Sequence, residues 1–181
     1  MDIKTLFGLP AHALLVHIPI VLIPLAAIGA LGLFWESWRR RFGWATAVIL
    51  AVAGVFTQLA IGSGQELKRQ LVNERNPLVG AHTRIAEDIR PWLLLFFVAL
   101  GAFLFFERRL RTAGTSVSLR NPLLAGTFVA AIAFAGVSCY WVYRIGHTGA
   151  KAVWVEKIQR ESGGAGSPRD APPPGGETGG N

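Results

Sequence analysis

The chain has 181 residues, of which 51% are hydrophobic and only 16% are charged, and its formal net charge is +7. Soluble domains carry about 25% charged residues, and here the charges are separated by long apolar runs, so the composition excludes an ordinary soluble domain and indicates a membrane protein. The basic residues adjoin the apolar runs, as topology-setting charges do, and no nucleic-acid partner is expected. The single cysteine, Cys139, excludes an intrachain disulfide and Cys-x-x-Cys-His attachment of haem.

Four apolar segments are predicted to cross the membrane, each needing about 20 residues. We expect these spans at residues 11–35, 42–62, 79–108 and 121–146. The third has only 16 uncharged residues, Pro91 to Phe106, so its helix should begin near Val79 with an amphipathic first part. The predicted fold is all-α: an integral membrane four-helix bundle, up-down-up-down, within a domain of residues 1–161.

The two ends of the chain are interpreted separately from the bundle. No charge occurs between Lys4 and Glu36, a run longer than the apolar core of a signal peptide, so the first span is read as a retained helix instead of a cleaved signal. Residues 150–161 are expected to form a short interfacial helix. Residues 162–181 are rich in Gly and Pro and are predicted to be disordered. We find no internal repeat in the sequence.

Arginines in the two short loops indicate the orientation. Seven Lys/Arg residues lie in these loops and eleven on the other side, so the raw count and the local density disagree. Charges in short loops next to span ends have the stronger effect. Both termini are therefore expected outside the cytoplasm. The short-loop arginines are Arg39, Arg40, Arg41, Arg108, Arg109, Arg111 and Arg120.

All four histidines are predicted to lie near the same membrane face. His12 and His17 open the first span, His82 opens the third, and His147 follows the end of the fourth. In a four-span chain these positions share one side, whichever way the protein is oriented. Ionisable groups at helix ends inside a membrane protein usually indicate function, so we predict a shared binding site.

The helical faces of two spans refine this site but leave alternatives open. At 100° per residue, His82 falls on an apolar arc with Ile85, Ala86 and Ile89, opposite a charged arc. This stripe either turns into the bundle, which we favour, or faces lipid. His12 and His17 are about 140° apart on an ideal helix, so they would flank a site from different sides.

Two charged residues are further candidates. Arg144 lies one turn before His147 and could neutralise an acidic group of a ligand, or reach to lipid phosphate instead. Glu66 is predicted in the same layer, where it could orient an imidazole, bind metal directly, or remain a solvated loop charge.

These residues resemble the bacterial membrane family called domain of unknown function 2231, over about residues 6–155. The resemblance rests on an opening Gly-x-Pro-x-His-x-x-x-x-His motif, a closing Gly-His-x-Gly motif, and weaker matches between them. In this chain the motifs are Gly8-Leu9-Pro10-Ala11-His12 with His17, Gly146-His147-Thr148-Gly149, Ser63-Gly64-Gln65-Glu66 and Ala81-His82. The resemblance implies a four-helix fold in a bacterial inner or plasma membrane. Relatives fused to cytochrome c or Rieske modules suggest respiratory electron transfer.

The leading functional hypothesis is one b-type haem near the outer face, held by two imidazoles from different helices. The preferred ligands are two of His17, His82 and His147, and the remaining histidines, including His12, and Arg144 would bind propionates. Electrons would pass to a quinol, a cytochrome or an oxidase subunit.

Two alternatives remain open. One is a non-haem copper, zinc or iron site formed by three of the four histidines with or without Glu66. The other is an accessory subunit of a membrane complex without a cofactor. No catalytic residue is predicted, and an electron carrier or complex subunit is expected more than a stand-alone enzyme.

Overall fold

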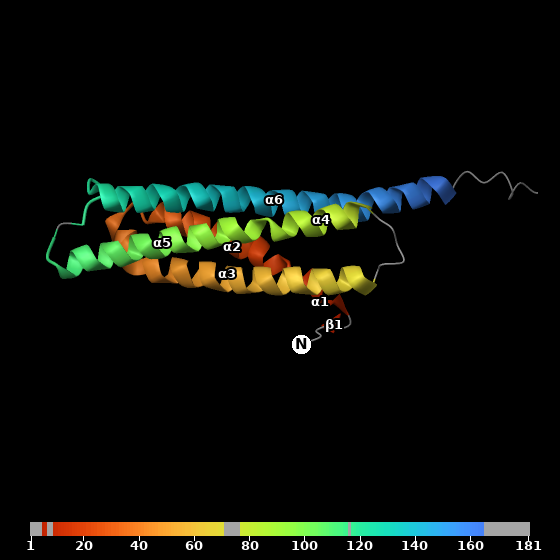
Figure 1. Cartoon of the computed structure of the whole chain (residues 1–181), viewed down its shortest axis with the longest axis horizontal. Helices are drawn as coiled ribbons and strands as arrows, with labels where there is room; N and C mark the ends of the chain where they lie inside the picture. Colours follow the sequence, from red (N-terminus) through yellow and green to blue (C-terminus); the bar gives the residue numbers. More distant parts are fainter. Residues whose placement is uncertain (1–4, 7–8, 71–76, 116, 165–181) are drawn as a thin grey trace, which may run out of the picture.

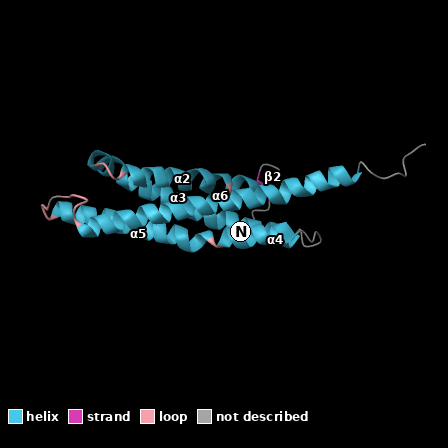
Figure 2. Cartoon of the chain, turned by 90° about the horizontal axis from the view of Figure 1, so that it is seen from above, coloured by secondary structure: helices cyan, strands magenta, loops and turns pink. Residues whose placement is uncertain are grey.

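The computed structural model is almost entirely helical (Figures 1 and 2). It describes residues 5–6, 9–70, 77–115 and 117–164. The strands β1 (Thr5–Leu6) and β2 (Leu9–Pro10) form a two-residue antiparallel pair before the first helix. The helices are α1 (Ala11–Leu15), α2 (His17–Gly32), α3 (Glu36–Gln70), α4 (Pro77–Glu87), α5 (Ile89–Thr112) and α6 (Pro122–Gly164).

Prolines explain why two of the predicted spans are interrupted. Proline lacks a backbone N–H and its ring crowds the carbonyl four residues earlier. Pro19 therefore removes the bond to the carbonyl of Leu15, where α1 ends, and Pro91 removes the bond to that of Glu87, where α4 ends. As a result, α1 and α2 meet at Val16, and α4 and α5 meet at Asp88.

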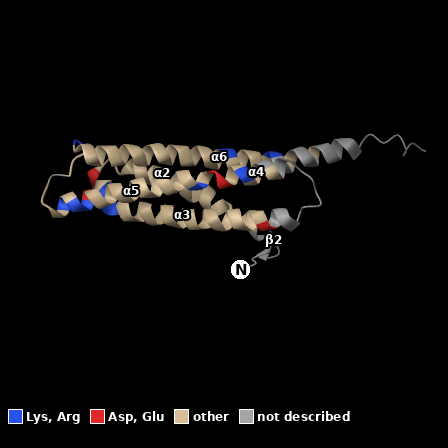
Figure 3. Ribbon diagram, in the orientation of Figure 1, with Lys and Arg blue, Asp and Glu red and all other residues tan. Residues whose placement is uncertain are grey.

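The helices have the length and composition of a membrane protein. Three ranges are long and apolar enough to cross a bilayer, namely Glu36–Glu66, His82–Thr112 and Pro122–Lys151, and His17–Gly32 is a shorter apolar helix. Charged residues gather toward the two ends of the bundle and the middle is almost free of them (Figure 3). Large apolar side chains are exposed along the helices, Val21 and Leu94 among them, and these surfaces contact lipid.

The last helix is longer than the sequence predicted. We expected the fourth span to end near residue 146, before a separate interfacial helix, but α6 continues without a break to Gly164. The glycines of α6 keep helical geometry. Among the described residues, the glycine with a positive φ is Gly114, which lies in the loop between α5 and α6. Of the predicted disordered tail, residues 162–164 end α6 and residues 165–181 lie outside the described residues.

The two halves of the chain pack in the same way. α2 packs on α3 and α5 packs on α6, while α1 contacts α3 and α4 contacts α6. Across the halves, α2 meets α6 and α3 meets α5, around a core that includes the fully buried Phe96, Phe103 and Ile23. The order α1-α2-α3 thus has a counterpart in α4-α5-α6.

Gly29 allows α2 to approach α3 closely, as small residues do between membrane helices. A Cβ at Gly29 would lie 2.8 Å from Oγ1 and 2.9 Å from Cγ2 of Thr46, a buried side chain whose hydroxyl donates to the Phe42 carbonyl. We expect Gly29→Ala to reduce the free energy of unfolding by about 1–3 kcal/mol through overpacking. Denaturant unfolding in detergent would measure this change.

Gly101→Ala is the matched control for Gly29→Ala. Gly101 lies on α5, is exposed, and has no heavy atom within 4 Å of an added Cβ. This substitution should leave stability unchanged or raise it by up to about 1 kcal/mol, because alanine is the better helix former. Equal stability of the two variants would contradict the close contact between α2 and α3.

Candidate cofactor site

A cavity of about 440 Å³ lies among residues of all six helices, α1 to α6, and we call it the central cavity. Its volume falls within the 300–1,000 Å³ typical of small-molecule and cofactor sites. Most of its wall is apolar, with Ile23, Ile61 and Ile89 as examples. Two imidazoles, those of His12 and His82, stand out in this apolar wall.

The ring of His12 is held by α3. Its Nδ1 lies 3.0 Å from the carbonyl oxygen of Ala60 and 3.4 Å from Oγ of Ser63. A carbonyl can only accept a hydrogen bond, so Nδ1 carries the proton and donates it. The neutral ring then has its lone pair on Nε2, the atom that is left to bind a ligand.

The ring of His82 is held by α6 in a similar way. Its Nδ1 lies 3.2 Å from Oγ1 of Thr148. That hydroxyl is 3.0 Å from the carbonyl of Arg144 and 3.1 Å from that of Ile145, so it donates its own proton to the backbone and accepts from the imidazole. Nδ1 is therefore the protonated nitrogen, and Nε2 again keeps the lone pair.

Each imidazole lies against a glycine of the neighbouring helix. A Cβ at Gly64 would be 2.9 Å from Cε1 and 3.1 Å from Nδ1 of His12. A Cβ at Gly149 would be 3.0 Å from Cε1 and 3.4 Å from Nδ1 of His82. In both cases Nε2 is the more distant nitrogen. Glycine at these two positions lets the rings sit directly on the helix backbone.

The two histidines therefore occupy equivalent half-sites, one in each half of the chain. On α3, Ser63 and Gly64 follow Ala60 by three and four residues, and these three hold His12. On α6, Thr148 and Gly149 hold His82, and the Thr148 hydroxyl donates to the carbonyl three residues earlier, that of Ile145, as the Ser63 hydroxyl does to that of Ala60. Both histidines precede the proline-induced break in their own span. The halves thus present two matching imidazoles to one cavity.

The orientation predicted for the third span is confirmed. His82, Ala86 and Ile89 line the central cavity, whereas Arg84 and Asp88 are exposed. The apolar stripe therefore turns into the bundle, and the alternative in which it faces lipid is wrong.

The other predicted site residues lie outside this cavity wall. His17 is exposed on α2. His147 is exposed on α6 and stacks on Tyr143, with ring centroids 5.9 Å apart. The guanidinium of Arg144 lies over the Trp141 ring, 5.1 Å from its centroid, and Glu66 is half-buried on α3. Of the four histidines predicted to share a site, the structure brings His12 and His82 to one cavity.

Sequence reasoning did not identify the residues that hold the rings. Ser63 and Thr148 each precede a glycine, and this Ser/Thr-Gly pair on two different helices is the signal that could have indicated them. Within the described residues, no group of three or more His, Cys, Asp or Glu side chains is placed to hold a metal ion.

The apolar helices, their lipid-facing surface and the cavity between them define a polytopic α-helical membrane protein. A family model described as predicted membrane protein (DUF2231) matches residues 8–162, and the chain belongs to this family. No curated protein and no solved structure matches the chain.

Proposed function

We propose that the chain is a membrane electron-transfer protein of the b-type cytochrome kind, with one haem in the central cavity and His12 and His82 as its axial ligands. One observation carries this proposal. Two imidazoles from different helices line one apolar cavity, and each has Nδ1 on a protein acceptor and a lone pair on Nε2. Metal-bound histidines typically have this arrangement, because the second hydrogen bond fixes the tautomer and ring orientation.

The number of imidazoles favours haem over a bare metal ion. Low-spin haem iron of electron-transfer proteins takes two ligands from the protein, and cofactor sites of helix bundles are built from side chains on facing helices. Structural zinc takes four protein ligands and catalytic zinc takes three. The central cavity offers two imidazoles. His12 replaces His17 and His147 in the ligand pair preferred from the sequence, because those two rings are exposed.

The protein's own residues would set the properties of the site. Bound haem supplies one-electron redox chemistry. The acceptors Ala60 and Thr148 hold the rings in place and raise the basicity of Nε2. Apolar residues such as Ile23 and Ile89 exclude water and limit the polar rearrangement that accompanies a change of charge.

The proposal includes four membrane crossings, alternately up and down, with both termini outside the cytoplasm of a bacterial plasma membrane. The 43 residues of α6 would extend about 65 Å, more than twice the ~30 Å hydrocarbon thickness. The end of α6 beyond Lys151 would therefore lie at the interface and outside it. Electrons would pass to a quinol, a cytochrome or an oxidase subunit.

The test is spectroscopic. The full chain is expressed with haem supplied, purified in mild detergent, and recorded oxidised and dithionite-reduced beside an elemental analysis. A Soret band with sharp reduced α and β bands and one iron per chain is expected. Stoichiometric copper, zinc or iron without a Soret band would replace the proposal with a non-haem site. Neither haem nor metal would leave an accessory subunit.

A further inference from the structure

A second cavity, of about 660 Å³, lies at the opposite end of the helices from the central cavity, and we call it the basic cavity. It is formed by the start of α3, the end of α5 and the loop before α6. Basic and acidic side chains gather at this end of the bundle (Figure 3). Three arginines line the cavity: Arg39, Arg40 and Arg111.

Arg39 is the unusual member of this set. Its residue is only 6% exposed, and Nε and Nη1 are buried without a hydrogen-bond partner among the described residues. The guanidinium carbon lies 5.8 Å from the centroid of the Phe103 ring. Burying the donors of a charged group without acceptors is strongly unfavourable, so a group that accepts from Arg39 would stabilise this arrangement.

The carboxylates nearby are hydrogen-bonded to the other arginines. Glu36 accepts from Arg40, and Glu107 accepts from Arg111, each one turn apart on the same helix. Both carboxylates are within electrostatic range of Arg39. Three guanidinium groups therefore face two carboxylates, and the basic cavity has an excess of positive charge next to the unmatched donors of Arg39.

We propose that the basic cavity binds a phosphate group, with Arg39 as its main ligand and Arg40 and Arg111 beside it. Guanidinium groups bind phosphate oxygens through paired, charge-assisted hydrogen bonds. The Ser118 hydroxyl, also in the wall, accepts the backbone N–H of Arg120 and keeps its own proton to donate. The site is independent of haem binding in the central cavity.

Two sources share this chemistry, an anionic lipid headgroup and free phosphate. Exposed tryptophans lie within a turn of the cavity residues, Trp35 before α3 and Trp38 in its first turn. Tryptophan is enriched at headgroup depth, so a phosphatidylglycerol headgroup can reach this cavity from the bilayer. Inorganic phosphate would have to enter from water.

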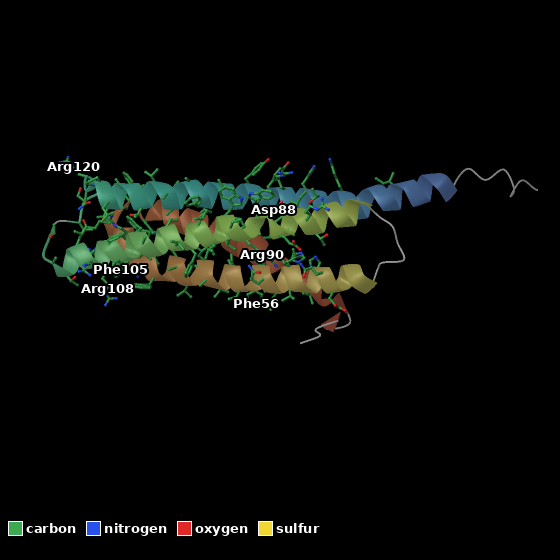
Figure 4. The ribbon with its side chains drawn as sticks, in the orientation of Figure 1. Phe56, Asp88, Arg90, Phe105, Arg108 and Arg120 are labelled. Atoms are coloured by element: carbon green, nitrogen blue, oxygen red, sulfur yellow. The ribbon has the colours of Figure 1, made fainter. Side chains whose placement is uncertain are left out.

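The test measures lipid retained by the full chain in mild detergent, by native mass spectrometry against phosphatidylglycerol and phosphatidylcholine. We expect wild-type protein to prefer phosphatidylglycerol and Arg39→Gln to bind it at least about tenfold more weakly, because a hydrogen bond to a charged group is lost. Arg108→Gln is the matched control. Arg108 is exposed at the same end of the bundle and is not part of the cavity wall (Figure 4).

A second variant keeps the test valid if Arg39→Gln does not fold. Arg40 lines the cavity, but its side chain is 63% exposed, so Arg40→Gln should fold and weaken binding by several-fold. If inorganic phosphate raises the melting temperature in an Arg39-dependent way and the two lipids bind equally, the source is free phosphate. If neither ligand depends on Arg39 or Arg40 more than on Arg108, the proposal is overturned.

Discussion

Alanine at His12 or His82 is expected to abolish the haem spectrum of the purified protein. Each ring would supply one axial ligand, and even the loss of a residue that merely supports a metal ligand typically reduces affinity 10–100-fold. The affinity for haem should therefore fall at least about 10–100-fold, as measured by haem titration of the detergent-solubilised protein. Both variants should remain folded, because an alanine in either place enlarges a cavity that already exists.

His17→Ala and His147→Ala are the controls for this experiment. Both rings are exposed, and neither lines the central cavity. These variants should keep the Soret band and the reduced α and β bands of the wild type. If His17→Ala or His147→Ala removes the spectrum while His12→Ala keeps it, the ligand assignment made from the cavity is wrong. If all four variants keep it, the histidines do not hold the haem.

The apolar pattern predicts the helical membrane fold well, because membrane helices must satisfy their backbone polar groups internally and display apolar side chains. Hydropathy alone does not show where a helix is interrupted within a span. The breaks at Val16 and Asp88 come from prolines three residues further along each span. Hydropathy does not predict the end of α6 either, because its polar last turns stay helical beyond the apolar run.

The position of His82 in the site could be predicted because α4 is a regular helix around it. A rotation of 100° per residue therefore places its side chain on the face that lines the cavity. The same arithmetic cannot rank His12 against His17, because the break at Val16 lies between them and interrupts a continuous helix. The sequence favoured His147 as a haem ligand because it was expected just past the end of the fourth helix. The helix instead continues, which turns Thr148 and Gly149 toward His82 and leaves His147 exposed.

The equivalence of the two halves leaves little trace in the sequence beyond the pairs Ser63-Gly64 and Thr148-Gly149. The residues around the two rings correspond in role but differ in type: Ser63 is matched by Thr148, and the Ala60 carbonyl, which accepts from Ser63, is matched by that of Ile145, which accepts from Thr148. A backbone carbonyl accepts a hydrogen bond whatever its side chain is, and either hydroxyl can accept from Nδ1. Selection for these hydrogen bonds therefore does not require the same residue types in the two halves.

The two glycines give the second large prediction. Gly64→Ala and Gly149→Ala should each reduce haem affinity by roughly 10–100-fold, the range reported for residues that orient metal ligands. The added Cβ would lie 2.9 Å from Cε1 of His12 or 3.0 Å from Cε1 of His82, so the ring must shift from its position on the backbone. Haem titration and the reduced α band would measure the change in affinity and in ring orientation.

Loss of fold can be separated from loss of ring position, because alanine is a better helix former than glycine by up to about 1 kcal/mol. The melting temperature of the apoprotein should therefore change little in either variant. Gly62→Ala on α3 and Gly136→Ala on α6 are the controls, since both glycines are exposed and an added Cβ meets no atom within 4 Å. Because the half-sites are equivalent, Gly64→Ala and Gly149→Ala should weaken haem binding to a similar extent. A large effect from one and none from the other would show that a single imidazole holds the ligand.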